Sequence, residues 1–307
     1  MNKIQYTYSI VVFDRGSPTL LTVLKSIEVA LKIGKIQNFE IFLFYSNSKF
    51  SLTIDDVLTR FPEIKVIGLP DKTAKIDLYN YALQRTKGDF LVLLNSNIKI
   101  KENFFQIINR YKDKTNLFSL TPKIEMQNGQ SFRKTYIYDD FYFIKQLSKA
   151  SSFSAPNGMA VYKREILLKV NGFDRAYNML NYSYWSDADV HLRAWQQGYG
   201  TVYEPELQVQ FLELEGSQSF YIPVIDFLEK PSLIDKLVWN SNKTIFFLSH
   251  KPNLIWRLLG NDLKRFNLWG GLAMLVGLIR GINRKKINLK PIYSFEKIIS
   301  IVEKESL

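Results

Sequence analysis

Residues 89–97, DFLVLLNSN, are the most informative stretch of the chain, because a run of apolar residues ends there in a polar triplet. Consecutive apolar residues without polar alternation are typical of a strand buried on both faces, as in a parallel sheet. The triplet of Asn95, Ser96 and Asn97 then lies at the carboxyl end of that strand. Open α/β sheets bind their ligands beyond the carboxyl ends of the strands, so the triplet is a predicted ligand-binding position.

Three further apolar runs precede this strand, and each of them ends in polar residues or in a loop. They are YSIVVF at 8–13, FEIFLFY at 39–45 and IKVIGL at 64–69. Apolar residues at helical spacing lie between the runs, at 20–33, 54–61 and 75–86. This alternation predicts βαβ units and therefore an α/β fold, with a mostly parallel, Rossmann-like sheet flanked by helices.

The second half of the main domain contains two informative segments. Residues 157–174, NGMAVYKREILLKVNGFD, predict a strand, a short helix and a turn. In residues 182–200, YSYWSDADVHLRAWQQGYG, Ser186 is a predicted helix cap, with Asp187 and Asp189 in the first turn. We expect short strands at 201–205 and 208–212 to close the domain.

The end of the chain differs from the rest in pattern and in charge, which predicts a division into residues 1–228 and 229–307. Residues 230–307 contain fourteen Lys or Arg and five Asp or Glu, so they carry +9 of the total charge of +12. The most apolar segment, 268–279, is shorter than the roughly eighteen residues that span a bilayer, and basic residues flank it. A helix in the lipid interface is one interpretation, and packing of this segment as core is the other.

Composition excludes several classes of site. The chain has no cysteine, so it contains no disulfide, thiolate zinc site or cysteine nucleophile. We expect a cytoplasmic location, because no secretory leader precedes the first strand. No nucleic-acid reader motif accompanies the basic residues, so nucleic acid is not an expected partner. His191 and His250 are isolated in the sequence, which argues against a zinc site.

Five segments in this order resemble the family 2 glycosyltransferases, which are inverting nucleotide-sugar enzymes of GT-A fold. The segments are YSIVVFDRG at 8–16, FEIFLFYSNS at 39–48, KGDFLVLLNSN at 87–97, residues 157–174, and WSDADVHLRAWQQGYGTVYEP at 185–205. The resemblance covers roughly residues 8–211. It implies a GT-A domain with a helical C-terminal extension, and the transfer of a sugar from a nucleotide sugar to a hydroxyl on a glycan or glycolipid.

The resemblance makes Asp187 the general base, which takes a proton from the acceptor hydroxyl as this attacks the anomeric carbon from the face opposite the nucleotide. Asp189 is expected to raise the pKa of Asp187 by repulsion, and Arg193 is expected to pair with Asp189 one helical turn later. Without the resemblance, the same residues are typical of a helix start with a surface salt bridge. Both interpretations remain open here.

Donor-binding residues are implied at the strand ends and beside them: Asp14, Arg15, Tyr45, Lys75, Asn80, Asn95 and Asn97. Asn157 and Gly158 begin the segment that resembles the acceptor side. Tyr45 stands where the family usually has a carboxylate for the nucleoside base, and it would either stack on a pyrimidine or close the pocket.

The metal-binding carboxylates of the family are replaced by Asn95 and Asn97, and Phe211 stands near the place of a metal-binding histidine. Neutral amides hold divalent cations weakly, so we expect either no metal cofactor or a weakly bound Mn²⁺ or Mg²⁺. The candidates for stabilising the leaving diphosphate instead are Arg15, Lys72, Lys75 and Arg193.

Two functions follow from these residues. The first is a glycosyltransferase at the inner face of the cytoplasmic membrane, which acts on a nucleotide sugar and a glycan or lipid-linked acceptor. The second is a catalytically inactive GT-A-like protein that binds or assembles with an active glycosyltransferase. Retention of Asp187 favours the first function, and loss of the metal-binding carboxylates favours the second.

Overall fold

A computed structural model describes most of the chain between residues 7 and 301. The residues outside this description are 1–6, 47–53, 71–72, 127–130, 133–135, 139–143, 147–150, 153–158, 181–182, 184, 213–232, 251, 253–254, 256–267, 283, 285–288, 295–296, 299 and 302–307. Three residues that the sequence suggested for the site, Lys72, Asn157 and Gly158, lie outside the described residues.

The main sheet follows the order β10-β12-β6-β11-β4-β1-β2-β3, with β5 paired to β12 and β7 paired to β6. Its strands are β1 (Tyr8–Asp14), β2 (Phe39–Ser46), β3 (Ile64–Leu69), β4 (Phe90–Asn95), β5 (Ile98–Ile100), β6 (Leu117–Glu125), β7 (Ser131–Phe132), β10 (Ser151–Ser152), β11 (Met159–Lys163) and β12 (Gly200–Phe211). Strands β1 to β4 pair in parallel with one another, whereas β11 runs antiparallel to β4 and β6. Strands β8 (Tyr136–Tyr138) and β9 (Ile144–Gln146) form a separate pair.

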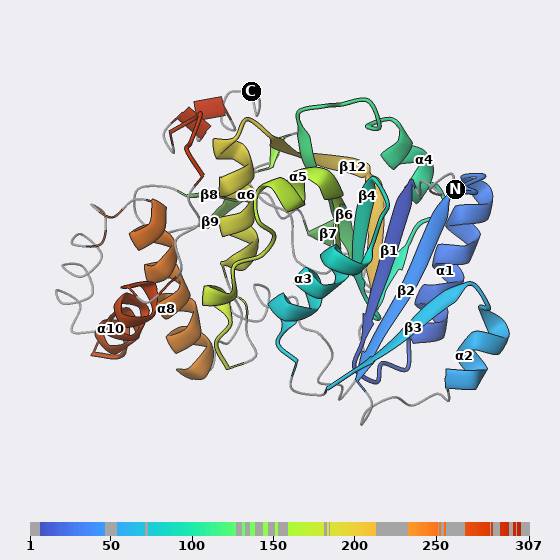
Figure 1. The fold of residues 1–307 in the computed structure, drawn as a ribbon, viewed down its shortest axis with the longest axis horizontal. Coiled ribbons are helices and arrows are strands. Elements are labelled where there is room, and N and C mark those ends of the chain that lie inside the picture. Colours follow the sequence, from blue (N-terminus) through green and yellow to red (C-terminus); the bar gives the residue numbers. More distant parts are fainter. Residues whose placement is uncertain are drawn as a thin grey trace.

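Helices cover both faces of the main sheet (Figure 1). They are α1 (Leu20–Ile33), α2 (Ile54–Arg60), α3 (Lys75–Arg85), α4 (Phe104–Asn109), α5 (Arg164–Lys169), α6 (Ser186–Gln196), α8 (Leu233–His250) and α10 (Leu268–Ile282), with a 3₁₀ turn, η1, at Arg175–Tyr177. The α/β fold expected from the alternating pattern is therefore confirmed.

The continuous apolar run of β1 fills two cores, because alternate side chains point to opposite faces of the sheet. Val11 and Phe13 belong to the core under α3, α5 and α6. Ile10 and Val12 belong to the core under α1 and α4. Burial on both faces explains why this strand, like β4, carries no inward polar alternation.

The structure differs from the sequence expectations at the end of the main domain. The two strands expected at 201–205 and 208–212 form one strand, β12, with a register shift between Glu204 and Gln208. The residue before α6 is Trp185, which has a left-handed backbone with φ of 70°. Ser186 is the first helical residue, and its hydroxyl donates to the Ser183 carbonyl at 2.6 Å, so the prediction that Ser186 caps the helix is wrong.

Two helices of the C-terminal extension pack on the main domain. Val238 and Phe246 of α8 and Met274 of α10 belong to the same core as Trp185, which precedes α6. The predicted domain boundary at 228/229 falls within residues that are not described, and it stays a prediction. Among the described residues, no helix is long and apolar enough to cross a membrane.

Candidate functional site

The carboxyl ends of three parallel strands lie side by side. Asp14 at the end of β1 is opposite Tyr45 of β2, and Phe13 is opposite Asn95 of β4. This register arises because β1 lies between β2 and β4 in the sheet. The edge therefore collects three of the residues predicted to bind a donor, as expected for the ligand-binding edge of an α/β sheet.

Asp14 shapes the loop after β1. Its buried carboxylate accepts the backbone N–H groups of Gly16 and Ser17, each at 3.0 Å, and Gly16 has a left-handed backbone with φ of 87°. The neighbouring Arg15 is partly exposed, and it donates from Nη2 to the Thr73 carbonyl at 2.9 Å. Asp14 thus holds the loop, whereas Arg15 places a cation between β1 and the start of α3.

Buried polar atoms without partners mark the end of β4. Asn95 and Asn97 are each 2% exposed. The Oδ1 of Asn95 and both side-chain polar atoms of Asn97 have no hydrogen-bond partner. Leaving such a group unsatisfied costs about 1–3 kcal/mol, so buried amides are normally bonded to protein or to another molecule. These three atoms are therefore the strongest local indication of a ligand.

Main-chain hydrogen bonds hold the asparagine pair in place. The N–H of Ser96 donates to the Phe13 carbonyl at 2.9 Å, and the Ser96 carbonyl accepts from Thr19 Oγ1 at 2.8 Å. The N–H of Leu212 donates to the Asn97 carbonyl at 2.9 Å, which brings the end of β12 beside the pair. The amide side chains are thus presented from a fixed backbone.

The residues around this pair do not fit a tightly bound divalent cation. Phe211 lies on the strand paired with β5, opposite Ile98, so an apolar ring borders the asparagines. The described residues contain no group of three or more His, Cys, Asp or Glu side chains that could hold a metal ion. Magnesium and calcium sites normally need carboxylate oxygens among several oxygen ligands, and two amides do not supply them.

Asp187 stands in the first turn of α6 and is partly exposed. Its charge acts on two fully buried phenols, Tyr79 of α3 and Tyr162 of β11. Burial raises the pKa of both phenols well above their ordinary value, and the charge of Asp187 raises it further, whereas Arg15 lowers the pKa of Tyr79. Asp187 and Arg15 therefore act on the same phenol, Tyr79, with opposite sign.

The phenol hydroxyls of Tyr79 and Tyr162 have no hydrogen-bond partner, although each is fully buried. Neither residue belongs to the site predicted from the sequence, because aromatic residues inside apolar runs are normally core. One signal was present: Tyr79 lies one helical turn after Lys75, whose Nζ is 5.8 Å from the centre of the tyrosine ring. Tyr162 has no such signal in the sequence.

Asp189 is fully buried, and both oxygens of its carboxylate accept hydrogen bonds. Its Oδ2 accepts from Arg193 at 2.9 Å from Nε and 2.8 Å from Nη2. Its Oδ1 accepts from His250 Nε2 at 2.9 Å, the Tyr177 hydroxyl at 3.1 Å and Arg284 Nη2 at 3.3 Å. Burial alone would raise the pKa of Asp189, but the surrounding cations hold it far below its ordinary value.

The expected pairing of Arg193 with Asp189 is confirmed, but the pair is not a surface salt bridge. The guanidinium of Arg193 also donates to the carbonyls of Val170 and Gly172. Neither side chain has exposed surface with which to contact a substrate or a diphosphate. The charge of Asp189 is neutralised by its partners, so its expected repulsion on Asp187 is weakened.

Asn80, another predicted donor-binding residue, has a structural partner. Its Nδ2 donates to the Phe173 carbonyl at 2.7 Å, and its Oδ1 accepts from the Phe173 N–H at 2.9 Å. Because both ends of the amide are occupied, Asn80 clamps the turn after α5 to α3.

Two other predicted donor-binding residues differ in exposure: Lys75 is buried, and Tyr45 is partly exposed at the strand edge.

His191 fixes the backbone of Asp187 from inside the main domain. Its Nδ1 lies 2.6 Å from the Asp187 carbonyl, which can only accept, so Nδ1 carries the proton. Its Nε2 then accepts from the Ser119 hydroxyl at 3.0 Å, and this hydroxyl lies 2.9 Å from Thr201 Oγ1. Burial lowers the pKa of His191 to about 3, so the ring is neutral and is not a proton carrier near neutral pH.

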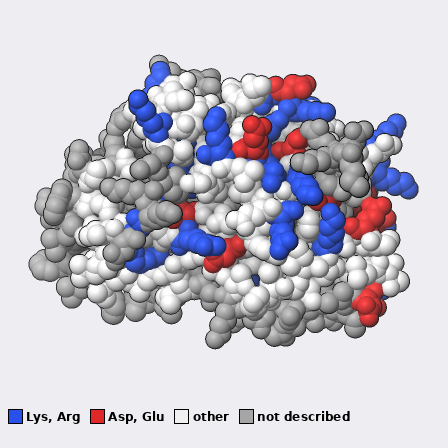
Figure 2. Space-filling model, viewed as in Figure 1, with Lys and Arg blue, Asp and Glu red and all other residues white. Residues whose placement is uncertain are grey.

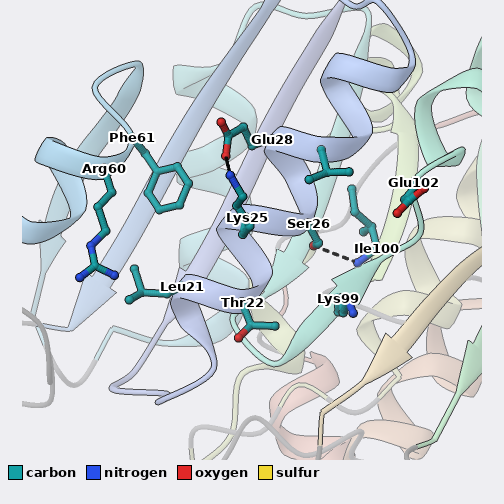
Figure 3. Close-up of a pocket in the computed structure, with 11 residues that line it drawn as sticks. Leu21, Thr22, Lys25, Ser26, Glu28, Arg60, Phe61, Lys99, Ile100 and Glu102 are labelled. Atoms are coloured by element: carbon teal, nitrogen blue, oxygen red, sulfur yellow. Dashed lines mark hydrogen bonds and ion pairs between the residues drawn. The ribbon is translucent and has the colours of Figure 1, made fainter.

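A separate hollow of about 710 Å³ lies beside α1 (Figure 3). It is lined by α1, the end of α2 and β5, and none of its lining residues was predicted for the site. Lys25 pairs there with Glu28 at 2.7 Å, and Ser26 Oγ accepts the Ile100 N–H at 3.3 Å. These polar groups bond to one another or face solvent, so no ligand-binding role is assigned to the hollow.

We expect Asp189→Asn to destabilise the protein strongly. The substitution leaves Arg193 and Arg284 buried beside a neutral amide, and breaking a buried ion pair costs about 3–5 kcal/mol. Urea unfolding measures the change in the free energy of unfolding. Glu28→Gln is the matched control, because its partner Lys25 is exposed and surface pairs contribute less than about 1 kcal/mol. Equal, small effects of the two substitutions would refute a buried charge cluster.

We expect His191 to make stability depend on pH. The unfolded chain binds this proton below pH about 6.5, whereas the folded chain binds it only near pH 3. Stability is therefore full above pH about 6.5 and decreases on acidification, by up to about 4–5 kcal/mol at the acid limit. Urea unfolding between about pH 7 and about pH 4.5 should show this slope in the wild type and a flatter slope in His191→Gln. Parallel slopes would contradict the assignment.

Comparison with known proteins supports the fold. No protein-family model matches the chain, and no curated protein matches it in sequence. A structure of GalNAc-T7 with UDP, GalNAc and Mn²⁺ covers 98% of this chain with a TM-score of 0.58 at 15% identity. A structure of S. aureus TarS 1–349 in complex with UDP-GlcNAc also covers 98% of the chain, with a TM-score of 0.55 at 11% identity.

The chain spans 58% of the GalNAc-T7 structure and 88% of TarS 1–349. At these identities the likeness establishes the architecture and leaves membership of family 2 a prediction. The chain has the GT-A-like fold of the glycosyltransferases.

Proposed function

We propose that this protein is a glycosyltransferase that moves a sugar from a nucleotide-sugar donor to a hydroxyl acceptor with inversion of configuration. The observation that supports this most directly is the position of Asp187. The charge of its partly exposed carboxylate acts on two buried phenols, Tyr79 and Tyr162, and the cation Arg15 from the loop after β1 acts on Tyr79 as well. A base and a cation at one edge of a GT-A-like sheet provide the groups that the reaction needs.

The proposed reaction is a single in-line displacement. Asp187 accepts the proton of the acceptor hydroxyl while the oxygen forms a bond to the anomeric carbon. The bond between that carbon and the diphosphate oxygen breaks, and the electron pair leaves with the nucleotide diphosphate. Arg15 and Lys75 lie near Tyr79 and are the proposed counter-charges for the leaving group.

We propose that the nucleotide diphosphate binds along the edge formed by Asp14, Tyr45 and Asn95. Support comes from the aligned strand ends and from the unpartnered amides of Asn95 and Asn97. The two similar solved structures hold UDP or UDP-GlcNAc, so uridine nucleotides are the first donors to test. Tyr45 is the proposed contact for the nucleoside base, and Asn157 and Gly158 are the proposed acceptor-side residues.

Metal independence is part of the proposal. Two neutral amides bordered by Phe211 are a poor site for a divalent cation. Mn²⁺ or Mg²⁺, if bound to the nucleotide, would screen phosphate charge, but the chain supplies few ligands for it. We also propose a cytoplasmic protein peripheral to the membrane, with an acceptor hydroxyl on a glycan or glycolipid.

A second function has its own supporting observation. Asn95, Asn97 and Phe211 all lack the ligand chemistry expected at these positions of a metal-dependent enzyme. A GT-A-like protein without activity, which binds or assembles with an active glycosyltransferase, would tolerate all three residues. The two functions differ in whether Asp187 is required for turnover.

We expect Asp187→Asn to lower kcat by about 10²–10⁴-fold, because a positioned general base typically contributes that factor. UDP affinity, measured by calorimetry, should change little, since the carboxylate acts on the acceptor. Glu165→Gln, at an exposed acid on α5, is the control and should keep full activity. Nucleotide binding without any transfer in the wild type, over a panel of donors and acceptors, would favour the inactive function.

We expect UDP to bind equally well in chelator and in MnCl₂, because the site offers amides in place of carboxylates. Asn95→Asp with Asn97→Asp restores two acids one residue apart, and Mn²⁺ should then strengthen UDP binding at least about tenfold. Circular dichroism checks that the double variant folds. Wild-type binding that requires Mn²⁺ would overturn metal independence, and it would leave the proposed transfer reaction standing.

A further inference from the structure

Helix α10 (Leu268–Ile282) has one face built for close packing. An added Cβ at Gly277 would lie 2.5 Å from the Ser241 carbonyl oxygen of α8, and one at Gly281 would lie 2.6 Å from Leu248 Cδ2. Ala273 and Met274 on the same side are buried. The small residues therefore let α10 approach α8 closely, and this face has its partner.

The opposite face of α10 has no partner among the described residues. Leu272, Leu275, Ile279 and Ile282 are 46%, 55%, 54% and 76% exposed. Their spacing of three, four and three residues places them in a single line along the helix. The other exposed large apolar side chains of the described residues are well separated from one another in the sequence. A stripe of this kind marks an interaction surface, because monomeric proteins rarely leave such patches in water.

The arginines of α10 and of the turn that follows it point inward and are not part of this stripe. Arg280 donates from Nη1 to Ser241 and Asn242, and from Nη2 to the Ala176 carbonyl. Arg284 pairs with Asp174 and Asp189. These bonds hold the helix on the main domain and leave its apolar line facing outward.

Charge near the helix selects the kind of partner. In the sequence, Lys264 and Arg265 precede α10, and Lys285, Lys286 and Lys290 follow it, whereas Asp262 is the only acid between residues 261 and 290. A second copy docked through the same helix would bring two such basic sequences together, which disfavours a symmetric dimer. An apolar line within basic sequence instead matches an anionic lipid surface. In Figure 2, uncharged atoms cover the described part of α10 on the face drawn, and Lys and Arg atoms lie nearby.

We propose that Leu272, Leu275, Ile279 and Ile282 form the docking face of the protein on an anionic membrane surface. The helix lies flat in the interface, because at fifteen residues it is too short to span a bilayer. This inference deepens the membrane-peripheral location given under the proposed function. The proposed contact residues are these four, and the proposed lipid class is anionic. The two interpretations of α10 then each apply to one side of the helix: one side packs in the core, and the other docks on lipid.

The same helix is linked to the proposed catalytic base. Arg284, two residues after α10, bonds to Asp189, and Asp189 lies in α6 two residues after Asp187. A docked α10 would therefore hold α6 at a set height above the lipid. This arrangement suits an acceptor hydroxyl carried on a lipid, since the base and the membrane contact belong to one packed unit.

The test uses the full chain and vesicles, without donor or acceptor. Vesicles of phosphatidylcholine alone are compared with vesicles containing about one-third phosphatidylglycerol, by co-sedimentation and by flotation. We expect binding to the anionic vesicles only, weakened by high salt. Leu275→Glu with Ile279→Glu should lower the partition coefficient at least about tenfold, because two apolar contacts become charges repelled by the surface. Leu275→Gln with Ile279→Gln should give an intermediate loss.

Ile33→Glu with Leu168→Glu is the matched control, since these exposed aliphatic residues lie elsewhere. It should bind as the wild type does. Thermal unfolding confirms that every variant folds. Wild-type binding by the Leu275/Ile279 variants would overturn the proposal, as would equal binding to neutral vesicles. A wild-type dimer in sedimentation velocity that the Leu275→Glu/Ile279→Glu variant abolishes would overturn it in favour of self-association. Because no sugar is present, failure here leaves glycosyl transfer untouched.

Discussion

The buried carboxylate of Asp189 is the interaction on which the arrangement of this protein depends. Desolvating one charge is costly, so the chain surrounds it with Arg193 from its own helix, His250 from α8 and Arg284 from beyond α10. These partners come from parts of the sequence up to 95 residues apart. The cluster thereby joins the C-terminal helices to α6, and Asp187 keeps its position because both ends of this network are fixed.

At the edge proposed to bind the donor, amides stand in place of carboxylates. Two carboxylates one residue apart would repel an anionic diphosphate, so they would need a cation between them and the phosphates. Amides do not repel phosphate oxygens, and their N–H groups can donate hydrogen bonds to them. Asn95 and Asn97 therefore change the electrostatics of the edge while keeping its geometry, since β4 and the loop after β1 hold the backbone in place. The unpartnered phenols of Tyr79 and Tyr162 extend this polar set toward Asp187.

Helix α10 of the C-terminal extension has two faces of different composition. Glycine and alanine on one side bring α10 against α8, and large aliphatic residues on the other side stay exposed. A helix with only the first face would be core, and one with only the second would detach from the domain. Both faces together make an element that belongs to the folded domain and still carries the surface proposed to contact lipid.

Residue order alone predicted the α/β class, the parallel order of the first strands, the edge where Asp14, Tyr45 and Asn95 meet, and the pairing of Arg193 with Asp189. Each of these follows from local periodicity, from the rule that parallel strands end at one edge, or from spacing along one helix. Three outcomes became visible only in the folded chain: Asp189 is buried among partners that include distant elements, Asn80 clamps a turn, and the charge of Asp187 acts on Tyr79 and Tyr162. Those outcomes depend on which distant elements desolvate a side chain and supply its partners, and no local pattern carries that information.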